Sequence, residues 1–150
     1  MSLKKLDQLI EQNVAEGADI VRGGPVTVDK IQRAEELLGV AFPPSYKDYL
    51  TQYGAIEIDG RSFAGLTANE VGAIGDVVAF TKNAREQYGI PDRYIALDFQ
   101  DGDVFLCIDT QSKDSAGESP LVLISPVNGK QQGAVVSQGL VDYLEKYLSA

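Results

Sequence analysis

The densest group of chemically versatile side chains in this sequence lies between residues 98 and 118. Its members are Asp98, Asp101, Asp103, Asp109, Asp114 and Glu118, and the same stretch contains one basic side chain, Lys113. Several carboxylates together could hold a hard cation such as calcium. The spacing D-F-Q-D-G-D, however, lacks the alternate acids and the closing glutamate of an EF-hand. Solvated acids around an Asp101-Gly102 turn are the simpler interpretation, and we expect no bound metal.

Paired carboxylates could also serve a hydrolase of the glycosidase type, which needs one acid with a raised pKa across a cleft from a second acid. A chain with 22 acidic side chains always offers such pairs, and no spacing here singles one out. The remaining interpretation is an acidic face for a basic protein partner, because a surface of one charge steers molecules of the other.

Residue types that usually carry catalysis are scarce. The chain has no histidine, which excludes Ser-His and Cys-His catalysis and histidine-ligated metals. Its one cysteine, Cys107, lies in the apolar run VFLCI, so neither an intrachain disulfide nor a zinc cluster can form. No G-x-x-x-x-G-K-S/T phosphate loop is present, and the glycines of EVGAIGD predict a turn instead. We therefore expect a protein that is not an enzyme and has no cofactor.

The charge balance restricts the partners. The chain carries 13 basic and 22 acidic side chains, for a net charge of -9. Phosphate backbones and anionic membranes need a positive surface, so we expect neither nucleic acid nor a membrane as partner. The opening MSLKKLDQLIEQN lacks the apolar run of a secretion signal, and no stretch approaches the ~20 apolar residues of a membrane span. We expect a cytoplasmic protein with a single domain over residues 1–150.

Five helices are predicted from apolar residues at helical spacing, at 3–14, 28–38, 44–53, 76–88 and from Ser137 to the C-terminus. Thr27 or Asp29 could cap the second helix, and Asp76 stands at the start of the fourth. Pro44 suits a first helical turn, and Gly39 and Gly54 suit helix ends. The third helix would bury one stripe of large side chains: Tyr46, Tyr49, Leu50 and Tyr53.

Strands are predicted on either side of two turn signals, Asp59-Gly60 and Asp101-Gly102, each of which is typical of a β-hairpin. PLVLIS should form a further strand and residues 132–136 a weak one, while 15–26 and 110–120 should be loops. Hairpins rather than helical crossovers join most strands. The pattern therefore predicts an α+β fold, with a largely antiparallel or mixed sheet and helices packed against it.

The order of these motifs resembles the SUKH superfamily. Residues 31–60 carry its entry motif: E-x-x-L-G ending at Gly39, then Phe42-Pro43-Pro44, S-Y-K-x-Y-L from Ser45, and Tyr53-Gly54 before a strand. IALDFQDGDVFLCIDT is similar to its second block, with a D-G-D turn between two strands. SQGLVDYLEKYL is similar to its C-terminal helix. The resemblance covers about residues 28–148 and implies a SUKH-like fold.

The resemblance also implies a function. Bacterial members of the superfamily are immunity proteins, which bind and neutralise a cognate polymorphic toxin, often a nuclease, and a eukaryotic branch acts in cell-wall regulation and signalling. We therefore expect an immunity protein that occludes a basic toxin domain; the alternative is a regulatory or scaffolding module without enzymatic activity. The candidate partner-binding residues are the acids of the two predicted hairpins: Glu57, Asp59, Asp98, Asp101, Asp103 and Asp109.

Overall fold

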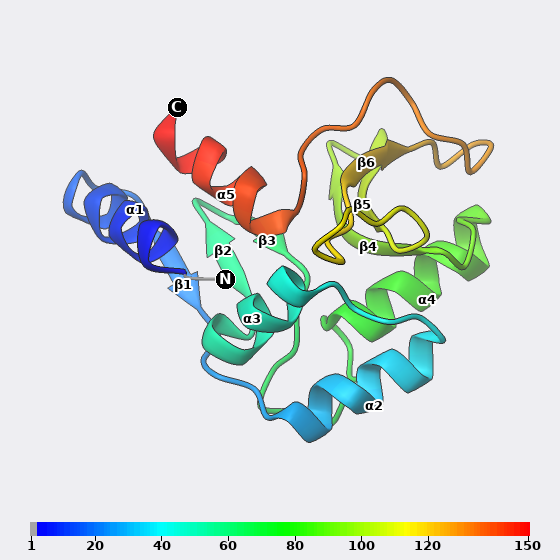
Figure 1. Cartoon of the computed structure of the whole chain (residues 1–150), viewed down its shortest axis with the longest axis horizontal. Helices are drawn as coiled ribbons and strands as arrows, with labels where there is room; N and C mark the ends of the chain where they lie inside the picture. Colours follow the sequence, from blue (N-terminus) through cyan, green and yellow to red (C-terminus); the bar gives the residue numbers. More distant parts are fainter. Residues whose placement is uncertain (1–2) are drawn as a thin grey trace.

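The computed structural model describes residues 3–150, in which helices and short strands are interspersed along the chain (Figure 1). In order they are α1 (Lys4–Ala15), β1 (Ile20–Arg22), α2 (Val28–Leu38), α3 (Pro44–Tyr53), β2 (Ile56–Ile58), β3 (Arg61–Phe63), α4 (Val77–Tyr88), β4 (Tyr94–Gln100), β5 (Val104–Asp109), β6 (Leu121–Ile124) and α5 (Leu140–Ser149). The predicted α+β fold is confirmed.

Several helix ends lie where local chemistry predicts them, although α5 begins at Leu140 and not at the predicted Ser137, which forms a bridge with Leu121. The Thr27 side chain accepts a hydrogen bond from the Lys30 backbone N–H and caps α2. Asp76 accepts one from the Ala79 N–H and caps α4 in the same way. Gly39 follows α2 with φ 70°, a left-handed conformation that glycine adopts at little cost.

The strands form two separate three-stranded antiparallel sheets, β1-β2-β3 and β4-β5-β6. Both predicted hairpins are present, and each turn uses an aspartate with positive φ, Asp59 at 48° and Asp101 at 51°. Two predictions of detail were wrong. Residues 20–22, expected in a loop, form β1 because β2 supplies their pairing partner. The stretch near 132–136, expected as a weak strand, is flanked only by isolated bridges of Gln131 and Ser137.

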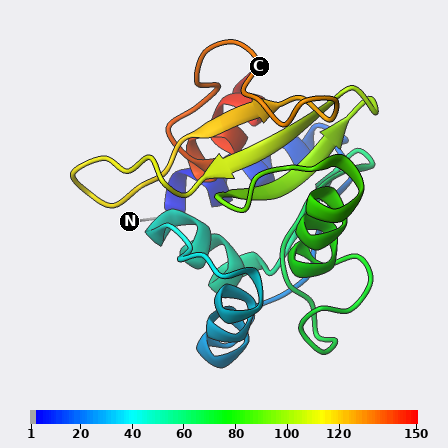
Figure 2. The ribbon, with the colours of Figure 1, turned by 90° about the vertical axis from the view of Figure 1, so that its right-hand side faces the viewer.

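The β4-β5-β6 sheet is covered on both faces, which explains its nearly continuous burial. One set of alternating side chains, including Ile95, Leu97 and Leu106, joins the main core with α1, α3 and α5. The other set, including Phe105 and Cys107, packs against α4. Figure 2 shows α2 and α4 on the same side of this sheet. Burial raises the pKa of the Cys107 thiol well above its usual range, so this cysteine is an unreactive core residue.

Candidate binding surface between the two hairpins

The β2-β3 and β4-β5 hairpins lie side by side although they belong to different sheets. The Ala64 N–H, just beyond β3, donates to the Leu97 carbonyl of β4 at 2.9 Å. The Arg61 guanidinium at the start of β3 donates to the Asp98 carboxylate at 2.8 Å. The two Asp-Gly turns are therefore brought to one region of the surface by tertiary contacts.

Arg61 connects this region to the C-terminal helix. Its guanidinium donates a second hydrogen bond, of 2.8 Å, to the Tyr143 hydroxyl on α5. It also lies over the rings of Phe63, Tyr143 and Tyr147, at 4.7, 5.5 and 5.2 Å from their centroids. Burial opposes the charge, but the bonds to Asp98 and Tyr143 outweigh it and hold the pKa of Arg61 above its ordinary value. Asp98 is thus engaged in an internal ion pair and is 18% exposed.

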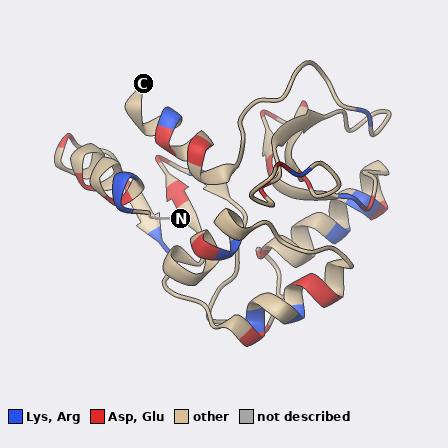
Figure 3. Ribbon diagram, viewed as in Figure 1, with Lys and Arg blue, Asp and Glu red and all other residues tan. Residues whose placement is uncertain are grey.

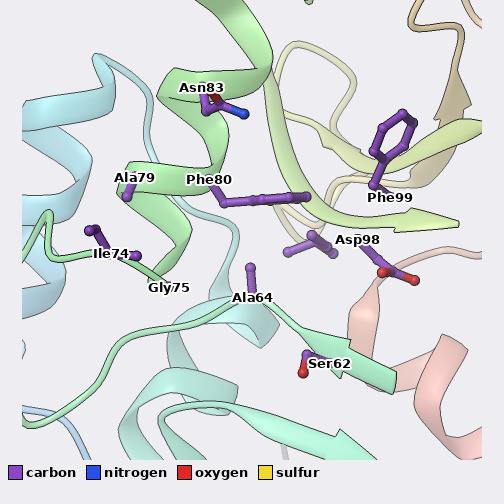
Figure 4. Close-up of a pocket in the computed structure, with 10 residues that line it drawn as sticks. Ser62, Ala64, Ile74, Gly75, Ala79, Phe80, Asn83, Asp98 and Phe99 are labelled. Atoms are coloured by element: carbon purple, nitrogen blue, oxygen red, sulfur yellow. The ribbon is translucent and has the colours of Figure 1, made fainter. Parts of the chain in front are cut away.

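An apolar hollow of about 540 Å³ opens between α4, β4 and the segment after β3 (Figure 4). Phe80 extends from α4 toward β4, where Phe99 lies, and Ala64 lies on the opposite side. Ile74 and Gly75 border the hollow beside Ala79. The volume is within the range of roughly 300–1,000 Å³ that is usual for binding pockets.

A second, polar hollow of about 700 Å³ adjoins the first and shares Ser62, Asp98 and Phe99 with it. Its other lining residues are Asp59, Gly60, Arg61, Gln100 and Asp101. The two hollows together are lined by three carboxylates and one guanidinium. An apolar depression therefore borders an acidic one on a single face of the molecule.

The predicted site residues divide into two groups. Asp59, Asp98 and Asp101 line the polar hollow, and Asp103 is exposed on the same turn as Asp101. Glu57 accepts a hydrogen bond from the Ser62 hydroxyl at 2.8 Å and lines a smaller neighbouring hollow of about 210 Å³. These five residues share one region of the surface.

Asp109 is not brought together with the others. It lies at the far end of β5 and is 4% exposed. Its carboxylate accepts two hydrogen bonds of 2.8 Å from Arg93 and one of 3.0 Å from the Ser112 hydroxyl. Glu118 is likewise engaged, by the backbone N–H and hydroxyl of Ser45 at the start of α3. Solvated acids around the turn, the simpler sequence interpretation, therefore do not describe these two residues.

Acidity by itself does not distinguish this face. Figure 3 shows aspartate and glutamate on all five helices as well as on the hairpins. The distinguishing residues are apolar and are not among the predicted site residues: Ile74, Phe80 and Phe99. The available signal in the sequence is Ile74 itself, a large aliphatic residue between Gly72 and Gly75, where the glycines predict only a turn.

Within residues 3–150 no group of three or more His, Cys, Asp or Glu side chains is placed to hold a metal ion. Across the same residues, none of the helices has the length and apolar character that a membrane span requires.

The surface between the hairpins is suited to holding an apolar side chain next to a cationic one.

A comparison with protein families gives a match over residues 6–148 to the family model described as SUKH_5: SMI1-KNR4 cell-wall. The match spans nearly the whole chain, including both hairpins and the two hollows. The resemblance expected from the sequence motifs is confirmed.

Proposed function

The chain belongs to the SUKH_5, SMI1-KNR4 cell-wall family, and on this premise we propose that it is an immunity protein, which binds a basic toxin domain in the cytoplasm and neutralises it by occlusion. The family includes toxin immunity proteins, and the members of the family are generally not enzymes. The proposal needs no cofactor, nucleic acid or membrane.

The observation that carries the proposal is the apolar hollow with carboxylates at its border. Protein interfaces commonly have an apolar centre, which supplies most of the binding energy, and a polar rim. Here Phe80 and Phe99 provide the centre, and Asp59 and Asp101 belong to the rim. A toxin that grips phosphates needs a basic surface, and acids placed around an apolar anchor suit that surface.

The acids and the apolar centre contribute differently. Complementary charge accelerates the encounter of two proteins. This acceleration decreases as salt is added, because the Debye length is only about 8 Å at physiological ionic strength. The apolar contacts instead slow dissociation. Exposed Asp101 and Asp103 should therefore affect mainly the association rate.

Where a gene for a large secreted protein lies immediately upstream, the direct test mixes the purified C-terminal domain of that protein with this one. We expect a stoichiometric complex and loss of the domain's toxic activity. Absence of a complex would refute the proposal. A complex that leaves the toxic activity intact would instead favour the regulatory or scaffolding alternative.

The contribution of the acids is tested by the double variant Asp101→Lys, Asp103→Lys. We expect its association rate to fall about tenfold at low salt and to depend less on salt than that of the unmodified protein. The matched control, Glu16→Lys with Glu36→Lys, makes the same charge change at exposed positions on or next to α1 and α2. Equal rates for both double variants would show that net charge, and not this face, governs association.

A further inference from the structure

The connection between β3 and α4 presents Ile74 to solvent at the border of the apolar hollow. Ile74 is fully exposed, with a relative accessibility of 101%, while Ala79 and Phe80 beside the hollow are half-buried. The free energy falls when a partner covers a large aliphatic side chain that was exposed to water. The position of Ile74 between Gly72 and Gly75, both with φ 97°, places it on a tight turn.

This segment, residues 67–76, is held in place from both ends and is called the Ile74 loop below. At its start, the Lys30 ammonium on α2 donates to the carbonyl oxygens of Thr67, Ala68 and Asn69 at 3.0–3.1 Å. At its end, the Asp76 carboxylate accepts hydrogen bonds from the N–H groups of Gly72, at 2.7 Å, and Ala79, at 2.9 Å. A loop ordered in advance loses little conformational entropy when it binds.

The opposite wall of the hollow is also fixed. Phe99 stacks on Phe105 with ring centroids 4.1 Å apart, and Phe80 contacts Phe105 at 5.9 Å. Phe105 itself is buried in the core under α4. The hollow is therefore a preformed receptor with rigid aromatic walls rather than a gap that closes.

The charge around the hollow selects the occupant. The adjoining polar hollow is lined by Asp59, Asp98 and Asp101 against Arg61, so three carboxylates and one guanidinium leave a net charge of -2 beside the apolar hollow. The whole chain carries a net charge of -9. A second copy of the chain would bring two acidic rims together, which like-charge repulsion disfavours. A basic partner would pair with the same rim.

We infer that the Ile74 loop and the apolar hollow form one docking site. Its occupant is an apolar side chain from a basic segment of a partner protein, in which lysines or arginines flank that side chain. This inference rests on the proposed function and deepens it, because it assigns the anchor of the complex and the chemistry of the partner segment. Lys30 is the positioning residue of the site, since it holds the loop without lining the hollow.

The test titrates the intact ¹⁵N-labelled protein with a short synthetic peptide that carries Phe-Leu between two pairs of lysines. We expect a dissociation constant of about 1 mM, with shift changes at Ile74, Phe80, Phe99 and Asp101. Ile74→Asp should weaken binding at least tenfold. The control Val127→Asp changes another exposed aliphatic residue, 91% exposed and outside both hollows, and should leave the affinity unchanged.

Two further peptides separate the two parts of the site. Replacing Phe-Leu by Gly-Ser, or the lysines by glutamates, should abolish binding; retained binding in either case would overturn the inference. Shift changes confined to another face, no binding by the original peptide, or self-association through this face in sedimentation would also overturn it. Lys30→Met should accelerate amide exchange in the Ile74 loop and weaken peptide binding while the rest of the spectrum is unchanged, and unchanged affinity would overturn the role of Lys30.

The peptide titration and the toxin experiment can fail independently. A toxin complex that forms without the Ile74 loop would leave the proposed function standing and refute the docking site. Peptide binding at the hollow without any toxin complex would refute the immunity function and leave the docking site standing for another basic partner.

Discussion

Tyr49 on α3 performs a structural task that a phenyl ring could not perform. Its side chain is completely buried. Its hydroxyl donates to the Phe63 carbonyl at 2.9 Å and accepts from the Ile56 backbone N–H at 2.9 Å. Ile56 and Phe63 lie opposite each other in the β2-β3 register. The hydroxyl thus connects the open end of this hairpin to the helix.

Tyr49→Phe should therefore destabilise the protein by about 2–4 kcal/mol. The ring and its packing are kept, so the loss comes from two hydrogen bonds to buried backbone groups. Each bond contributes roughly 0.5–1.5 kcal/mol, and up to about 3 kcal/mol where its backbone partner is left unsatisfied. The pairing of Ile56 with Phe63 in the β2-β3 register limits that cost. With a urea m-value of about 2 kcal/mol per molar, the middle of the usual range, the unfolding midpoint should fall by about 1–2 M, with m unchanged.

The measurement is urea unfolding followed by far-ultraviolet circular dichroism. Tyr147→Phe is the control, because this ring is 39% exposed and its contacts with Phe63 and Arg61 need no hydroxyl. Its stability should change by less than about 0.5 kcal/mol. If Tyr49→Phe were equally neutral, the backbone groups of Ile56 and Phe63 would be satisfied by hydrogen bonds to each other. The bridging role of the Tyr49 hydroxyl would then be refuted.

Two further predictions concern the same helix. Leu50→Ala removes a fully buried side chain from the main core and should cost about 2–5 kcal/mol in the same urea assay, whereas a loss below about 0.5 kcal/mol would contradict the facing of α3. Burial raises the pKa of both Tyr46 and Tyr49 above the ordinary value of about 10, so the folded state binds these two protons more tightly than the unfolded state. Stability should consequently be unaffected by these groups below about pH 10 and fall as the pH rises further. Absorbance near ~295 nm should show the two phenols ionising only together with loss of circular dichroism, and reversible ionisation of all seven tyrosines in the folded protein would contradict this.

Much of the fold could be predicted because its signals are local. A cap such as Thr27 or Asp76 acts on the next turn of the same chain, and an Asp-Gly pair bends the chain at its own position. β1 could not be predicted in this way. Three residues carry too little periodicity, and Ile20–Arg22 become a strand only because β2 lies beside them.

The candidate site was only partly predictable. The sequence indicated the acids of both turns, and Asp59 and Asp101 do line one hollow. It could not show that Asp98 is paired with Arg61 or that Asp109 is buried against Arg93, since these contacts depend on how the sheets meet. It also gave no reason to separate Phe99 from the core, because an aromatic residue in a strand is usually buried.

The sequence by itself determined the helices, the two hairpins, the family and the absence of histidine-based chemistry, because composition, capping and turn formation act within a few residues. Only the tertiary structure decided that the strands divide into two sheets, that the hairpins nevertheless meet, and that an apolar hollow opens between them. The physical reason is the distance along the chain. The contacts that build this face join Lys30 to Asn69, Arg61 to Tyr143 and Ala64 to Leu97, and no local pattern encodes which distant partner a side chain will find.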